Sequence, residues 1–389
     1  MFSKRWLRLP RRLVVQALRV GIFSTKISLF CLSACTLHSQ VRVGADLFIE
    51  KHLDLVKGKN VGLITNHTGR VTSGKFFLDT LLANDVNVVA LFGPEHGVRG
   101  DAAAGESVKD SKDTRTGIPI YSLYGKTRKP TPDMLHDVDV LIYDIQDVGA
   151  RFYTYISTMA LAMEVAAEAG ISFVVADRPN PLGGIRVDGP ILEDSLKSFV
   201  GMFPIPVVYG MTCGELAQMI NGEGWLNDKV KADLIVIPME GWRRRMTWEE
   251  TELPWMRPSP NIPTPSTARV YPATCFLEAT NVSEGRGTPR PFRTIGAPYI
   301  DSEDLSASLA ALGLQGVKFS PVSFTPTSSK YGGIECHGVF IEVTDQESFQ
   351  PVITGLHIIG QIKRMYPSDF ILRSRPFKRL MGSTEVYDL

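Results

Sequence analysis

The chain has 389 residues, of which 44% are hydrophobic and 21% charged, an ordinary composition for a soluble globular protein that excludes a disordered or fibrous chain. Its length predicts two domains, each able to bury its own core. The formal charge of +1 hides an asymmetry, because residues 1–34 carry seven of the 42 Lys and Arg residues and no acid. The other 35 basic residues face 41 acidic ones, which argues against a nucleic-acid partner.

The N-terminus has the layout of a secretory signal. A basic stretch precedes an apolar run at residues 27–34, far shorter than the ~20 apolar residues of a membrane span. The run ends in Leu-Ser-Ala-Cys at residues 32–35, which resembles a bacterial lipoprotein box. We therefore expect residues 1–35 to be a lipoprotein-type signal peptide with Cys35 as the lipidated residue. The alternatives are an ordinary cleaved signal with a chance cysteine and a start codon assigned too early.

This signal predicts export. We expect the protein at the periplasmic face of the outer membrane, since Thr36 and not an acidic residue follows the cysteine. The lipid would be its only contact with the membrane.

Residues 41–262 alternate between short apolar runs and helical patterns. The runs are rich in β-branched residues and lie at 61–64, 86–92, 138–143, 171–176, 205–209 and 234–237. Continuous apolar runs suit strands buried on both faces of a parallel sheet. A helix is expected over 153–169, and Thr212 with Glu215 has the spacing of a capping box that opens another helix. We predict an α/β fold with a Rossmann-like, mostly parallel sheet and helices on both faces.

Residues 263–389 read as a smaller, mixed α+β domain. Five prolines between Pro254 and Pro265 predict an extended crossing into it. Strands are expected over 268–276, 316–324 and 338–343, and a helix over 349–365.

Polar residues collect where four of the predicted strands end. They lie at 65–69, 93–100, 144–151 and 177–181. In an open α/β sheet, ligands bind outside the carboxyl ends of the strands. Asn, Asp and Gly are common in any turn, but turns have no need of the Glu and Arg residues found here. The four ends together therefore indicate a functional site.

Several of these segments resemble the exo-β-N-acetylmuramidase family of the NamZ type. The resemblance is carried by residues 93–100, 144–155, 176–184, 258–261 and 278–288. It implies a Rossmann-like catalytic domain at 41–262, an auxiliary domain at 263–389 that closes a cleft, and release of N-acetylmuramic acid from the non-reducing ends of peptidoglycan fragments during cell-wall turnover. It also implies that Glu95, in the Gly-Pro-Glu-His-Gly segment, is the leading catalytic residue.

Glycoside hydrolysis usually needs one carboxyl group that protonates the leaving oxygen and a second group that stabilises or attacks the anomeric carbon. Glu95 suits the acid role if partial burial raises its pKa. Asp144 and Asp147 are the first candidates for the second group, with Asp177 and Glu284 behind them. The acetamido group of the substrate is an alternative nucleophile, and Asp144 and Asp177 have purely structural alternatives.

N-acetylmuramic acid carries an anionic lactyl ether, so a selective pocket should hold an arginine. Arg151, Arg178 and Arg286 lie in suitable segments, with loop-holding salt bridges as the alternative for each. Further candidates for substrate contact are His96, Tyr153, Tyr155, Asp177, Glu284, Asn66, Asn180, Asn261 and Asn281. The two tyrosines could equally be core residues, and the asparagines turn residues.

No cofactor or metal is expected. His67 and His96 lack the spacing of a known metal motif, residues 284–288 lack the spacing and lysine of a P-loop, and no G-x-G-x-x-G follows the first strand. After the signal, Cys213, Cys275 and Cys336 form neither a disulfide framework nor a zinc motif.

Two other functions stay open at this point. One is a non-catalytic periplasmic lipoprotein that binds muropeptides, and the other is a hydrolase of another glycosyl or acyl substrate.

Overall fold

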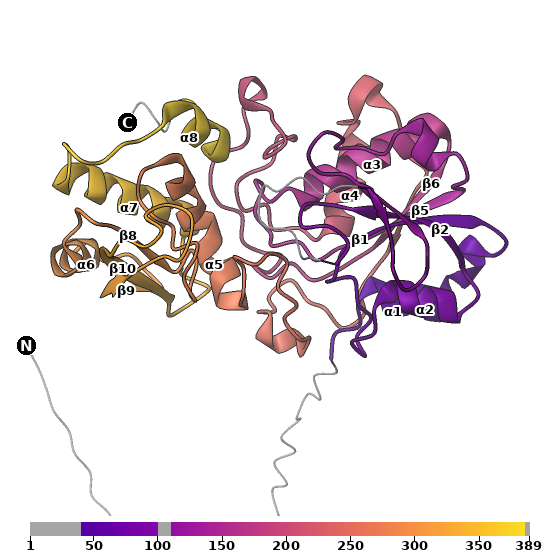
Figure 1. Ribbon diagram of the computed structural model, residues 1–389, viewed down its shortest axis with the longest axis horizontal. Helices are drawn as coiled ribbons and strands as arrows, with labels where there is room; N and C mark the ends of the chain where they lie inside the picture. The colour runs from indigo at the N-terminus through magenta and orange to yellow at the C-terminus, as the bar shows by residue number, and fades with distance from the viewer. Residues whose placement is uncertain (1–39, 100–109, 386–389) are drawn as a thin grey trace, which may run out of the picture. The chain divides into compact units, whose positions relative to one another are not determined.

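A seven-stranded sheet organises the N-terminal part of the computed structural model, which describes residues 40–99 and 110–385 (Figure 1). The predicted signal peptide and Cys35 lie outside these residues. The strand order is β3-β4-β2-β1-β5-β6-β7, and every neighbouring pair is parallel except β3 with β4. The strands are β1 (Asn60–Thr65), β2 (Asn87–Gly93), β3 (Ser111–Lys112), β4 (Pro119–Ser122), β5 (Val140–Asp144), β6 (Ser172–Ala176) and β7 (Leu234–Ile237).

A smaller antiparallel sheet and most of the remaining helices follow. Its order is β8-β10-β9, with β8 (Thr294–Ala297), β9 (Val317–Phe324) and β10 (Cys336–Val343). The α-helices of the described chain are α1 (Gly44–Lys51), α2 (Phe77–Ala83), α3 (Tyr155–Ala169), α4 (Cys213–Glu223), α5 (Pro265–Thr274), α6 (Ser302–Ala310), α7 (Pro351–Met365) and α8 (Ser374–Met381). Short 3-10 helices lie at Leu53–Val56, Pro132–Leu135, Asp194–Leu196, Asn227–Lys229, Glu249–Thr251 and Cys275–Ala279.

The large sheet is buried on both faces. Along β5, Leu141 and Tyr143 belong to one core cluster, while Val140 and Ile142 belong to the other, because successive side chains point to opposite faces. Helices α3 and α4 pack on the first face and α1 and α2 on the second (Figure 1). The Rossmann-like α/β architecture and the additional smaller α+β part are thus confirmed.

Most of the predicted elements are present, but two predicted strands are wrong. Residues 205–209 are irregular and pair only through single bridges such as Asp188 with Val208. Residues 268–276 belong to α5 and the 3-10 turn after it. Thr264 caps this helix, accepting a hydrogen bond from the Thr267 amide at 3.1 Å, and Pro265 occupies its first position. This cap and the early proline favour a helix despite the β-branched and aromatic residues that follow.

The predicted capping box is confirmed at the start of α4. The Thr212 side chain accepts from the Glu215 amide, and the Glu215 carboxylate accepts from the Thr212 amide. Within residues 40–99 and 110–385, no helix is long and apolar enough to cross a membrane.

Candidate active site

A cavity of about 440 Å³ lies beside the loop that follows β2; we call it the Glu95 cavity. Its walls come from the loops after β2, β4 and β5, from Val200 and from the C-terminal part of the chain. The polar and charged residues that line it are Glu95, His96, Tyr124, Tyr153, Thr154, Ser259, Tyr271, Glu278, Glu284, Arg286, Ser329 and Lys330. Five predicted site residues therefore meet here: Glu95, His96, Tyr153, Glu284 and Arg286.

A tight turn presents Glu95 to the cavity. The Gly97 amide donates to the Pro94 carbonyl at 2.9 Å, and His96 and Gly97 both adopt left-handed backbone conformations, with φ of 71° and 73°. His96 is buried, whereas Glu95 is only partly buried. The turn thus directs a carboxylate toward open space at the end of a buried strand.

Hydroxyl groups surround the Glu95 side chain. The Thr154 hydroxyl donates to Glu95 Oε2 at 2.9 Å. Thr154 is the N-cap residue of α3, but its side chain makes no cap hydrogen bond. Burial, together with the nearby Glu95 carboxylate, raises the pKa of Tyr124 to about 12. Tyr124 therefore stays protonated at neutral pH and able to donate a hydrogen bond.

The C-terminal part contributes a network of two acids and two bases. Arg286 Nη2 lies 2.6 Å from Glu278 Oε1, and Arg286 Nε lies 3.2 Å from Glu284 Oε1. Lys330 Nζ lies 2.9 Å from Glu284 Oε2 and also donates to two backbone carbonyls. The Glu284 side chain is 3% exposed and that of Glu278 34%. Burial raises the pKa of Glu278, and Arg286 opposes this shift.

Gly285 sets the direction of this network. Its φ is 77°, and an added Cβ would lie 2.2 Å from the Thr294 carbonyl oxygen. Only glycine fits such a position without strain. Glu284 and Arg286, the neighbours of Gly285 in the chain, both line the Glu95 cavity.

Asp144 and Arg178 form a separate, closed pair. Asp144 is fully buried and receives hydrogen bonds from Arg178 Nε at 2.5 Å and Arg178 Nη2 at 2.9 Å. Burial raises the pKa of Asp144 and the Arg178 charge opposes the rise. Neither residue lines the Glu95 cavity, so the geometry favours the structural alternative for both.

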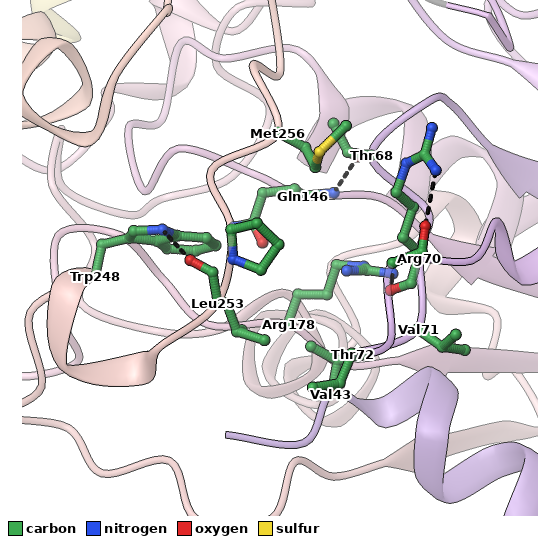
Figure 2. A pocket seen from close by; sticks show the side chains of 12 residues that line it. Val43, Thr68, Arg70, Val71, Thr72, Gln146, Arg178, Trp248, Leu253 and Met256 are labelled. Atoms are coloured by element: carbon green, nitrogen blue, oxygen red, sulfur yellow. Dashed lines mark hydrogen bonds between the residues drawn. The ribbon is translucent and has the colours of Figure 1, made fainter. Parts of the chain in front are cut away.

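This pair adjoins a different cavity of about 290 Å³, the Trp248 cavity. Figure 2 shows Arg70, Gln146 and Arg178 around it, with Trp248 and Met256 also in its lining. Glu95 is not part of it.

Asp147 and Asp177 are buried and bonded to nearby loops. Asp147 accepts hydrogen bonds from the Tyr209 hydroxyl and, at 2.6 Å, from the Gly149 amide. Asp177 accepts from the Thr212 hydroxyl at 2.6 Å and the Gly214 amide at 2.8 Å, which holds the start of α4. Burial raises the pKa of each carboxyl to about 6. Neither lines the Glu95 cavity.

Arg151 binds only backbone in the described chain. Its Nη1 donates to the Pro190 and Ile205 carbonyls at 2.8 and 2.7 Å, and its Nη2 to those of Leu380 and Met381 at 3.1 and 2.7 Å. The residue is 1% exposed. Arg151 therefore links the segments around residues 190, 205 and 380, and most of its donors are not available to a ligand.

The remaining predicted residues do not line the Glu95 cavity. Tyr155 is a core residue whose hydroxyl lies 2.6 Å from the Pro258 carbonyl oxygen and 3.5 Å from the Glu95 carbonyl oxygen. Asn66, Asn180 and Asn281 hold turns through hydrogen bonds to backbone or neighbouring side chains. Asn261 is partly exposed outside the lining.

Sequence reasoning missed Tyr124, Thr154, Glu278 and Lys330. Glu278 opens the 278–288 segment and could have been found there. Tyr124 and Lys330 carry no local signal, because only the fold brings them to Glu95 and Glu284. Among the residues that the structure describes, no three His, Cys, Asp or Glu side chains lie together in a metal-binding arrangement.

Known proteins share this architecture. The N-terminal model of the exo-β-N-acetylmuramidase NamZ family matches residues 61–266, and its C-terminal model matches residues 269–389. The peptidoglycan β-N-acetylmuramidase NamZ of Bacillus subtilis (strain 168) is 53% identical over 346 residues, which are 88% of this chain and 83% of that protein.

Two crystal structures of DUF1343 family proteins from Bacteroides fragilis NCTC 9343 are also similar. The one at 1.65 Å resolution has a TM-score of 0.84 and 41% identity, covering 90% of this chain and 91% of that chain. The one at 1.30 Å has a TM-score of 0.74 and 36% identity, covering 90% of each. The chain therefore belongs to the exo-β-N-acetylmuramidase NamZ family.

Proposed function

We propose that this protein is an exo-acting glycoside hydrolase that releases N-acetylmuramic acid from the non-reducing ends of peptidoglycan fragments. Membership of the family and the similarity to the Bacillus subtilis enzyme support the reaction. The observation that carries the proposal is the Glu95 cavity, where an accessible carboxylate shares one space with Glu278, Glu284 and Arg286.

Glu95 is the proposed general acid. A general acid must lie within hydrogen-bond reach of the leaving oxygen, and Glu95 lies in a fixed turn with one carboxylate oxygen held by Thr154. This carboxylate lines the Glu95 cavity, where it would reach the leaving oxygen of a bound substrate.

The second group is better sought at Glu278 and Glu284 than at Asp144 or Asp147. The two glutamates line the same cavity as Glu95, while the two aspartates do not. A carboxylate in this cavity can stabilise positive charge at the anomeric carbon. The acetamido group of the substrate stays an alternative nucleophile.

Arg286 is the proposed partner of the lactyl carboxylate. Of the three predicted arginines, it alone lines the Glu95 cavity. It binds Glu278 through Nη2 and Glu284 through Nε, so Nη1 can bind a ligand oxygen. A guanidinium adds charge-assisted hydrogen bonds in a fixed plane.

We also propose export and lipid attachment at Cys35, with 41–262 as the catalytic and 263–389 as the auxiliary domain. The sequence pattern at residues 32–35 supports the anchor. Cys35→Ser should abolish lipid labelling and release the protein from membranes of a bacterial host. A wild-type protein that is already unlabelled and soluble there would contradict the anchor.

The decisive experiment is incubation of the purified protein with the disaccharide MurNAc-GlcNAc, followed by mass spectrometry of the products. Free N-acetylmuramic acid is expected, and a disaccharide with GlcNAc at the non-reducing end should be cleaved far more slowly. Binding without turnover would favour a muropeptide-binding protein. Cleavage of other substrates alone would favour a different hydrolase.

A further inference from the structure

A second cavity, of about 370 Å³, adjoins the Glu95 cavity across one tight turn; we call it the Phe199 cavity. Ser198 and Gly201 exchange two backbone hydrogen bonds of 2.8 and 2.9 Å, so Phe199 and Val200 form the tip of the turn. Phe199 lines the second cavity, and Val200 lines the Glu95 cavity. The two cavities therefore share this turn as a common wall.

Helix α3 runs along both spaces. Thr154, its N-cap, lines the Glu95 cavity, while Ala160 and Leu161 line the Phe199 cavity. Between them, the Ser157 hydroxyl donates to the Phe199 carbonyl at 2.8 Å and ties the turn to the helix. Six residues of helix correspond to about 9 Å. The second cavity is thus close enough for an adjoining part of the same substrate.

Aromatic rings connect Glu95 to the Phe199 cavity. Tyr124, which interacts with the Glu95 carboxylate, has its ring centroid 6.3 Å from that of Phe199. The Arg128 guanidinium lies 4.6 Å from the centroid of the Phe199 ring. Farther along, Phe203 and Trp225 are stacked at 6.0 Å. Phe199 and Trp225 are partly exposed.

The lining has the chemistry of a sugar site. Partly exposed aromatic rings offer apolar surfaces for the C–H faces of a pyranose, and the Arg128 guanidinium offers donors for its hydroxyls. The buried Ser198 hydroxyl oxygen has no hydrogen-bond partner among the described residues. A ligand hydroxyl would satisfy it.

The position of the acid decides which sugar lies there. A general acid acts on the glycosidic oxygen, which joins the terminal sugar to the next one. If the terminal sugar binds beside Glu284 and Arg286, the next sugars leave the Glu95 cavity on the side of Glu95. Tyr124 and Thr154, the partners of Glu95, lead to the Phe199 cavity.

We propose that the Phe199 cavity binds the leaving part of the glycan, the hexosamine sugars on the reducing side of the scissile bond. This inference rests on the proposed function and adds to it a preference for chains longer than a disaccharide. Two features carry it, the shared turn at residues 198–201 and the aromatic rings of Tyr124, Phe199 and Trp225.

The test compares kcat/KM for a MurNAc-terminated tetrasaccharide with kcat/KM for MurNAc-GlcNAc. The wild type should prefer the tetrasaccharide. Phe199→Ala and Trp225→Ala should lower the ratio of the two values by about five- to tenfold, because they remove apolar ring surface. Leu161→Trp, which fills the cavity without removing a contact, should lower it as well. Phe370→Ala, a partly buried phenylalanine outside both cavities, is the matched control.

Equal ratios in the wild type and all variants would overturn the inference, whatever the absolute rates. A wild type that cleaves neither substrate would instead contradict the proposed function. In that case, calorimetric titration of Glu95→Gln with the tetrasaccharide still tests whether the Phe199 cavity binds the glycan. The added change Phe199→Ala should weaken this binding, and unchanged binding would refute the site.

Discussion

The Asp144 pair and the Glu95 cavity both lie beyond the carboxyl ends of the large sheet, yet they are built differently. Asp144 and Arg178 are 0% and 7% exposed and bind each other through two hydrogen bonds. Around Glu95, the charged groups face a common space, and the Arg286 side chain is 22% exposed. A charged residue at a strand end thus becomes a candidate for catalysis only when it faces a cavity, as Glu95 does.

The largest expected effect is on turnover by Glu95→Gln. Glutamine cannot donate the acid proton, so kcat should fall by about 10²- to 10⁴-fold. The melting temperature should stay close to that of the wild type, because Glu95 is only partly buried. Steady-state kinetics on MurNAc-GlcNAc measures the loss, and Glu168→Gln, at the exposed end of α3, is the control. Near-normal turnover would remove Glu95 from the acid role.

Asp144→Asn should chiefly affect stability. It leaves the Arg178 guanidinium buried without its carboxylate, which typically costs about 3–5 kcal/mol. Chemical denaturation gives the free energy of unfolding, and Asp137→Asn, in an exposed pair with His136, should change it by less than about 0.5 kcal/mol. A stable variant that has lost turnover would make Asp144 catalytic after all.

Arg286→Lys tests whether Arg286 selects muramyl over glucosaminyl substrates. Lysine keeps the charge but loses the planar pair of donors, so kcat/KM on muramyl substrates should fall by about tenfold more than on glucosaminyl ones. Arg290→Lys, whose guanidinium lies over Phe340 outside the cavity, should leave the selectivity unchanged. Equal losses on both sugars would assign Arg286 to the support of Glu278 and Glu284.

The last prediction concerns the pH dependence of stability. Burial raises the pKa of Asp147 from 3.8 to about 6, so between about pH 4 and 6 the folded protein holds this proton more tightly than the unfolded chain does. The carboxyl therefore destabilises the fold as the pH rises through this range, by roughly 2–3 kcal/mol at most. The stability of Asp147→Asn relative to the wild type should increase from pH 4 to pH 7. A constant difference in unfolding free energy would contradict this.

The sequence predicts five of the seven strands of the large sheet, because these five are continuous apolar runs, whereas the short strands β3 and β4 are not predicted. A strand that is buried on both faces consists mostly of apolar residues, as β5 and β6 do. The same signal misled at residues 205–209, where an apolar segment is buried without joining the sheet. Thr264 and Pro265 have the pattern of a helix N-terminus. From the sequence, they are expected in the extended crossing because they lie in a proline-rich stretch.

The site is predicted only in part, because the roles of its residues depend on tertiary pairing. Glu95 could be found from its strand-end loop and the family resemblance. Nothing local distinguishes Arg286, which lines a cavity, from Arg151, which binds four carbonyls. Lys330 is 46 residues from Glu284 and lies in no recognisable motif.

The carbonyls that Arg151 binds have a consequence for the timing of folding. Two of them come from residues 190 and 205, and two from residues 380 and 381 at the end of α8. Gly382 closes over the guanidinium so tightly that an added Cβ would lie 2.2 Å from Nη2. Until residues 380–382 have docked, this buried guanidinium in the first half of the chain lacks two of its four acceptors. The loop that holds Arg151 therefore reaches its final hydrogen bonding only when the last helix is in place.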